Sequence, residues 1–167
     1  MILAKERDPR LVTVRRGGTL TDDDHRLLAA WAVACAEHVL PLFEQERPDD
    51  DGPRSVLAVA QAWIRGEVPM KTAHDAAFRA NSAGRGLPDP ARFAALSAGQ
   101  AVAVAHVAAH DLGAAAYAIR AVAADSGAAA GIAEREWQRD RLPSEVRALV
   151  LDDQRRRDPI CWGVFGA

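Results

Sequence analysis

Apolar residues recur at the spacing of an α-helix along most of the chain after residue 20. A first helix is predicted over residues 21–45, where Thr21 can cap the start and three aspartates, Asp22 to Asp24, fill the first turn. Its apolar face is marked at helical spacing by Leu27, Trp31, Cys35, His38 and Leu42. Pro41 lies inside this pattern, so a kink or an early break is expected there.

Proline and glycine divide the middle of the chain into shorter helices. Residues 47–53 form a predicted turn, and Pro53 suits the first position of the next helix. Gly66 ends that helix, and Pro69 can start another. Residues 84–90, which hold two glycines and two prolines, are the clearest loop in the chain.

The second half begins with a long alanine-rich helical pattern over residues 91–124. A single helix of that length is unusual in a globular domain, so we expect a break near residues 110–113. Gly127 ends the pattern, a helix through Trp137 follows, and Pro143 opens the last helix. The tail from residue 159 carries Trp162 and Phe165, so it is expected to dock on the domain.

Residues 1–20 differ from the rest because residues 11–14 are β-prone. They predict an extended arm or one short strand that packs on the domain or on a second subunit. Residues 21–167 are predicted to form a single all-α domain of six to seven antiparallel helices, arranged as a bundle or as stacked helical hairpins.

Composition supports this fold and narrows the classes of partner. The chain has 167 residues, 36 of them alanine, the residue with the best helix propensity. The net charge is −2 and no long basic stretch occurs, so no nucleic-acid partner is expected. Residues 155–157 are three consecutive arginines, which we interpret as the solvated end of a helix.

Hydropathy and cysteine usage indicate a cytoplasmic protein. No stretch approaches 18 consecutive strongly apolar residues, and the N-terminus lacks the hydrophobic region of a signal peptide, so no membrane association is expected. The two cysteines, Cys35 and Cys161, form neither a disulfide framework nor a paired zinc motif.

His106 and His110 are the first candidates for chemistry. Their i, i+4 spacing would place both imidazoles on one face of a helix, where they could bind a metal, with His38 or His74 as a third ligand. No glutamate adjoins either histidine to make a His-Glu-x-x-His motif. A structural role in hydrogen bonding is therefore the favoured interpretation, and no cofactor is predicted.

The acidic turn is the second candidate. Asp49, Asp50 and Asp51 could together bind Mg²⁺ or Ca²⁺, but the pattern of an EF-hand loop is absent. Arg47 and Arg54 flank the three carboxylates. Capping combined with ion pairing is therefore favoured over a cation site.

No motif of nucleophilic catalysis is found. Cys35 and His38 lie three residues apart on the first helix, but a thiol buried beside Trp31 would have a raised pKa and be inert. The sequence contains no Gly-x-Ser-x-Gly elbow and no phosphate-binding glycine loop. Trp31, Trp63 and Trp137 are predicted core residues, whereas Trp162 in the tail could anchor an interface.

Several of these segments, taken in order, resemble one bacterial family. They include residues 15–18, 27–32, 35–43, 62–63, 105–110 and 112–118, and the most distinctive is the turn Arg47-Pro48-Asp49-Asp50-Asp51-Gly52-Pro53-Arg54. The chain resembles the Imm-5-like putative immunity proteins. The family-motif residues are expected to be structural: Trp31, His38, Arg47, Asp49, Asp50, Asp51, Arg54 and Trp63.

The resemblance implies a non-enzymatic protein that binds and neutralises a bacterial toxin. With a net charge of −2 the chain is a poor electrostatic mimic of nucleic acid, so shape and apolar anchors should matter more than net charge. Two alternatives are kept open. One is a metal-binding helical-bundle enzyme using His106 and His110, and the other is an oligomeric scaffold or homodimer in which the arm and the tail cross between subunits.

Overall fold

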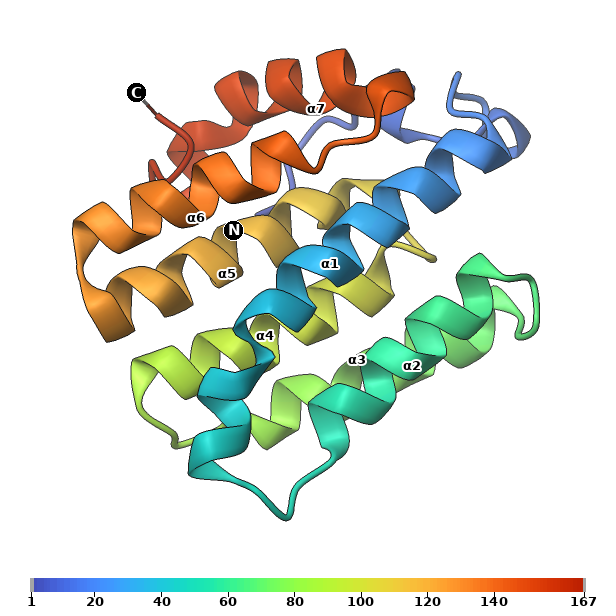
Figure 1. The fold of residues 1–167 in the computed structure, drawn as a ribbon. Coiled ribbons are helices and arrows are strands. Elements are labelled where there is room, and N and C mark those ends of the chain that lie inside the picture. Colours follow the sequence, from blue (N-terminus) through green and yellow to red (C-terminus); the bar gives the residue numbers. More distant parts are fainter. Residues whose placement is uncertain (1, 167) are drawn as a thin grey trace.

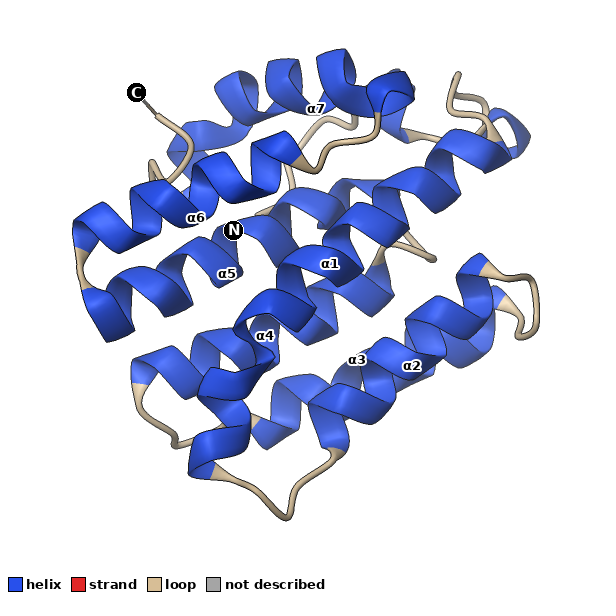
Figure 2. Cartoon of the chain, viewed as in Figure 1, coloured by secondary structure: helices blue, strands red, loops and turns tan. Residues whose placement is uncertain are grey.

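The computed structural model describes residues 2–166, and these fold into one helical domain with a short N-terminal segment (Figures 1 and 2). The predicted all-α class is confirmed. The helices are α1 (Asp22–Glu46), α2 (Gly52–Ile64), α3 (Met70–Ala83), α4 (Asp89–Ala103), α5 (Asp111–Ser126), α6 (Ala128–Asp140) and α7 (Ser144–Arg157). Four short 3-10 turns join or flank them: Pro9–Leu11, Val14–Arg16, Ala108–His110 and Asp158–Cys161.

The first helix follows the prediction at both ends. The Thr21 hydroxyl accepts a hydrogen bond from the backbone N–H of Asp24 at 3.1 Å, as an N-cap does. The expected early break at Pro41 is wrong, because α1 continues through Pro41 to Glu46. Pro41 is exposed, so its ring occupies solvent and not the packed core.

Helices α1, α4 and α5 form the centre of the domain (Figure 1). The α2–α3 hairpin packs on α4 from one side, and α6 covers α5 from the other. Helix α7 lies beyond α6 and contacts the first helix and the C-terminal turn. The helical hairpins therefore stack in chain order around one continuous core.

Alanine allows the central helices to approach closely. The core-facing positions of α4 and α5 are almost all small, including Ala94, Ala98, Ala114 and Ala118, each fully buried. A Cβ added to Gly99 would lie 2.1 Å from the side-chain oxygen of Asn81 on α3. Small side chains thus replace bulky apolar ones at these crossings, and the alanine content serves packing as well as propensity.

The break in the alanine-rich region comes earlier than expected. The sequence predicts an interruption at residues 110–113, whereas α4 ends at Ala103 and α5 begins at Asp111. Gly113 lies inside α5, where its missing side chain leaves room for Gln100. The glycine that suggests a helix end is therefore a packing position.

The N-terminal segment folds back onto its own domain. It contains two 3-10 turns and one isolated bridge between Thr13 and Leu20, in place of the predicted extended arm or strand. Leu11 and Leu20 are buried in the common core. Arg10 forms an ion pair of 2.8 Å with Asp152 on α7, which fastens the segment to the last helix.

The tail docks, as predicted. Phe165 is buried, and the Asp158 carboxylate accepts a hydrogen bond from the Phe165 backbone N–H at 2.8 Å. Trp162 stays 42% exposed and adopts a left-handed backbone conformation with φ of 58°.

Helix α1 is the one described helix that is long and apolar enough to cross a membrane by length and composition. Over half of its most apolar window, 56%, is buried inside the domain. Its hydropathy is therefore accounted for by its central place in the core.

Candidate functional site

His106 and His110 do not share a helical face. The helix expected to carry both ends at Ala103, so His106 lies in the following turn and His110 in the next 3-10 turn. The His110 Nδ1 lies 2.7 Å from the side-chain oxygen of Gln100. Burial, with the positive charge of nearby groups, lowers the pKa of His110 to about 4, so the ring is neutral at pH 7.

The expected third ligands are divided between distant places. His74 on α3 does approach His106, with ring centroids 4.5 Å apart. His38 on α1 instead lies 2.7 Å from the Glu134 carboxylate and stacks on Trp137. Among residues 2–166 no group of three or more histidine, cysteine or acidic side chains is placed to hold a metal ion.

The acidic turn connects three helices. Asp50 accepts a hydrogen bond from the Gly52 backbone N–H at 2.8 Å, and Asp51 pairs with Arg79 of α3 at 2.6 Å. Arg54 of α2 pairs with Glu44 of α1, also at 2.6 Å. These contacts are local capping and ion pairing, and Asp49 and Arg47 are exposed at the surface.

The most distinctive surface feature is a cleft between the N-terminal segment and the turn that follows α4. It has a volume of about 330 Å³. Its walls come from four separate parts of the chain: the N-terminal segment, the start of α1, the α2–α3 connection and the turn after α4. We call it the basic cleft, because its titratable lining residues are all basic: Arg7, Arg15, Arg16, His25 and His106.

The charges of the basic cleft are only partly neutralised by the protein itself. Arg15 pairs with Asp22 at 3.0 Å. Arg16 donates to the backbone carbonyl of His106 at 3.0 Å but forms no ion pair within residues 2–166, and neither does Arg7. Both side chains are exposed, so at least two positive charges face solvent at this cleft.

Both histidines of the cleft have a lowered pKa. Burial lowers the pKa of His106, and the positive charges of His74, Arg16 and Arg7 lower it further. Burial also lowers the pKa of His25, whose Nε2 lies 2.6 Å from the Val104 carbonyl. The His106 Nδ1 atom is buried and has no hydrogen-bond partner in the described structure.

An apolar strip continues from the cleft along α3. Trp63 and Met70 line the cleft, and Trp63 packs edge-on against His25 with ring centroids 4.9 Å apart. His74 and Phe78 follow Met70 at helical spacing, and their rings contact each other. Phe78 is 65% exposed, which is unusual for so large an apolar side chain.

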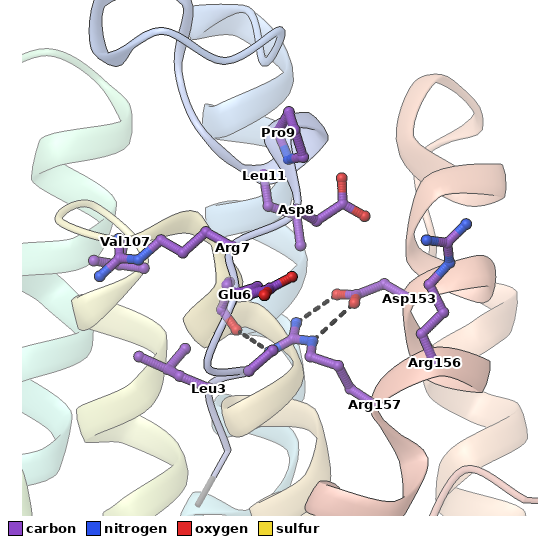
Figure 3. Close-up of a pocket in the computed structure, with 12 residues that line it drawn as sticks. Leu3, Glu6, Arg7, Asp8, Pro9, Leu11, Val107, Asp153, Arg156 and Arg157 are labelled. Carbon is purple, nitrogen blue, oxygen red and sulfur yellow. Dashed lines mark hydrogen bonds and ion pairs between the residues drawn. The ribbon is translucent and has the colours of Figure 1, made fainter.

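A second cleft lies against the other side of the N-terminal segment, and Figure 3 shows its lining. Its volume is about 320 Å³, and it shares Arg7, Leu11 and Val107 with the basic cleft. We call it the mixed-charge cleft, because Glu6, Asp8 and Asp153 line it together with arginines. The Arg7 side chain points away from Asp153 in Figure 3.

Arg157 is the centre of a buried ionic group beneath the mixed-charge cleft. Its guanidinium donates to Asp153 and lies 3.4 Å from Asp111. It also donates to the backbone carbonyls of Ile2 at 3.1 Å and Ala109 at 2.8 Å. The interpretation of residues 155–157 as a solvated helix end is therefore wrong for Arg157 and holds for its two exposed neighbours.

The buried group holds two carboxylates and one guanidinium. Burial raises the pKa of Asp111 to about 7, and the negative charge of Asp153 also raises it, although Arg157 acts in the opposite direction. Asp111 Oδ2 has no partner among the described residues. Arg157 itself keeps its charge, and its contacts join α5, α7 and the N-terminal segment.

The cysteines show no sign of reactivity. Burial raises the pKa of the Cys35 thiol, as expected from the sequence, and raises that of Cys161 to about 11. Both are free thiols inside the core.

The tryptophans divide between core and surface. Trp31 is buried and donates its indole N–H to the Gln138 carbonyl at 2.9 Å, whereas Trp63 and Trp137 are only partly buried. Trp162 stacks on Arg120, with the guanidinium carbon 4.0 Å from the ring centroid. The same guanidinium lies 4.1 Å from the Phe93 ring centroid.

Sequence patterns singled out His106 and Trp63 for other reasons, but not the remaining residues that make the cleft. His25 occupies the first helix without a motif, and Arg7 and Arg16 lie in a segment that was expected to be extended. The signal that could have found them is the excess of arginine over acidic residues in residues 7–18, where four arginines face one aspartate.

Comparison with known proteins gives one match. The model of the Imm-5 like putative immunity protein family matches residues 18–145, more than three quarters of the chain. No curated protein and no solved structure matches the chain. The matched range includes His25, Trp63 and Met70 of the basic cleft, whereas Arg7 and Arg16 precede it.

Proposed function

The chain belongs to the family of Imm-5 like putative immunity proteins, and on that basis we propose that it binds a partner toxin and neutralises it without catalysing a reaction. Family membership is the observation that carries the proposal. An inhibitor of this kind needs a rigid scaffold and an exposed patch suited to a protein partner. The fully buried helix crossings of α4 and α5 supply the first requirement.

The surface around the basic cleft supplies the second requirement. Interfaces are enriched in arginine, methionine and aromatic residues. Arg16, Met70 and Trp63 line the cleft, and the exposed Phe78 lies farther along α3. Two of the four large apolar residues that the described structure exposes, Val14 and Phe78, belong to the elements that border the cleft.

The two alternatives receive less support from the contacts. A metal-dependent enzyme would need His106 and His110 on one helical face, and the helix ends before either residue. A scaffold in which the N-terminal arm crosses to a second subunit would need that arm free, whereas Leu11 is buried against its own domain. Homodimer formation stays a prediction that light scattering can test, as does a cytoplasmic location, which two free thiols fit.

The test is co-expression with the toxin encoded by a neighbouring gene. Cells that carry the toxin alone should stop growing, and cells that also carry this protein should recover. A complex should then survive size-exclusion chromatography at micromolar concentration. Absence of protection together with absence of a complex would contradict the proposal.

A further inference from the structure

In the described part of the chain, the basic cleft brings together two arginines that form no ion pair, and no acidic side chain lines it. Some arginines elsewhere pair with carboxylates: Arg54 with Glu44, Arg79 with Asp51, and Arg92 with Asp89. Other exposed arginines, such as Arg85, form no ion pair within residues 2–166, but they do not line this cleft. Arg7 and Arg16 pair with no carboxylate of residues 2–166, although the chain as a whole carries a net charge of −2. The local excess is therefore a property of this place and not of the composition.

The shape of the cleft restricts what could neutralise that charge. A volume of about 330 Å³ accommodates one or two side chains, and the floor is apolar where Trp63 and Met70 lie. A carboxylate bound near Arg16 would also lie close to His106, which lines the same cleft. The exposed ring of Phe78 lies farther along α3, outside the cleft.

We propose that the basic cleft receives acidic side chains from a surface loop of the partner protein, with separate apolar residues of the same loop packing on Met70 and on Phe78, which lie about two helical turns apart on α3. This inference rests on the proposed function for the identity of the occupant. Charge complementarity selects a partner with a negative patch, and the apolar strip selects a protein over a free anion, because a small anion has no group to cover Phe78.

The N-terminal segment would then set which partner is accepted. It contributes Arg7 and Arg16, which precede the family-matched range, whereas the floor of the cleft comes from residues inside that range. A floor inside the family-matched range with arginines of the wall outside it is an arrangement in which the wall can change charge without disturbing the core.

The first arm of the test does not need the toxin. The full chain, labelled with ¹⁵N, is titrated with a peptide of six glutamates followed by leucine, and the Trp63 indole N–H and the His106 ring are followed by NMR. We expect saturable shifts with a Kd in the millimolar range and a rise in the pKa of His106 as the anion binds. Absence of shifts at 10 mM peptide would overturn the inference.

Matched probes separate the sources of negative charge. A glutamine peptide of the same length should leave both signals unchanged. Acetate, inorganic phosphate and a hexathymidine oligonucleotide are compared at equal charge. If any of these binds more tightly than the glutamate peptide, the occupant is a free anion or a nucleic acid, and the assignment to a protein loop is wrong.

The second arm uses charge reversal in cells. The double variant Arg7→Glu, Arg16→Glu should lower peptide affinity at least tenfold and abolish protection against the toxin. The control is Arg85→Glu, an exposed arginine in the loop before α4 that does not line the cleft. Circular dichroism melting checks that both variants fold.

The two arms distinguish failure of the inference from failure of the function. Full protection by the double variant would refute the cleft as the partner site and leave the immunity role intact. Peptide binding without any protection by the unaltered protein would support the anion site and count against the proposed function.

Discussion

The two clefts beside the N-terminal segment have nearly the same volume and share part of their lining, but they differ in whether their arginines are paired with carboxylates inside the protein. In the mixed-charge cleft the arginine that matters most, Arg157, is buried and surrounded by Asp153, Asp111 and two backbone carbonyls. In the basic cleft Arg16 is exposed and meets one carbonyl. A charge that is fully paired inside the protein serves the fold, and a charge left open to solvent is available to a partner.

Removing the buried guanidinium should have the largest effect on stability. Arg157→Met leaves Asp153 and Asp111 buried without their cation, so we expect a loss of about 3–5 kcal/mol in the free energy of unfolding. Urea denaturation followed by circular dichroism measures it. Arg155→Met on the exposed face of the same helix is the control and should cost less than about 1 kcal/mol. Equal losses in the two variants would show that Arg157 is not a structural centre.

The pH dependence of stability tests the charge balance of the buried group. Asp111 has a folded-state pKa of about 7, above its ordinary value of 3.8, so it binds a proton more tightly when folded. Its contribution to stability is full below about pH 4 and is lost as the pH rises to about 7.

Asp111→Asn removes that titration. The difference in unfolding free energy, unaltered protein minus variant, should therefore fall between pH 4 and pH 7, by on the order of 1 kcal/mol or more. Comparing the two proteins at each pH cancels the opposite contribution of His110, whose folded-state pKa is lowered. A difference that stays constant over this range would contradict the assigned pKa.

The same type of substitution in the basic cleft should have a smaller effect on stability. Arg16→Met loses one exposed hydrogen bond to the His106 carbonyl, so we expect a change within about 1 kcal/mol in urea denaturation. The substitution also removes the positive charge of Arg16, which lowers the pKa of His106 in the unaltered protein. The pKa of His106 should therefore rise in an NMR titration of the variant. A large loss of stability would instead show that Arg16, like Arg157, stabilises the fold.

A third arginine, Arg120, lies against aromatic rings in place of carboxylates. Arg120 lies between Trp162 and Phe93 and forms no ion pair within residues 2–166. Trp162→Ala should cost about 0.5–1 kcal/mol, the range of a cation–π contact at an exposed site. Thermal melting measures the loss, and Ile132→Ala, at an exposed position on α6, is the matched control.

The sequence predicted the helices well because their signals are local. Thr21 with its three aspartates marks the start of α1, and Pro53, Pro69 and Pro143 each lie within a residue or two of a helix start. The break between α4 and α5 was placed too late, because Gly113 is conspicuous in the sequence but serves packing against Gln100.

The candidate site was beyond the reach of local patterns. Its lining joins residues 7–16, 25, 63–70 and 105–108, which are brought together only by the tertiary fold. The spacing of His106 and His110 suggested a shared face that exists only if the helix continues. The buried position of Arg157 also depends on the tertiary fold, because nothing in three consecutive arginines shows which of them points inward.

The contact between Arg157 and the Ile2 carbonyl joins two ends of the chain that are synthesised far apart in time. The N-terminal segment is synthesised long before its partners Asp152 and Arg157 on α7. Helices α1 to α5 can pack earlier, because their contacts are closer in sequence. The wall of the basic cleft is therefore fixed only after α7 has been synthesised, and a chain cut short before α7 would carry the floor of the cleft without its anchored wall.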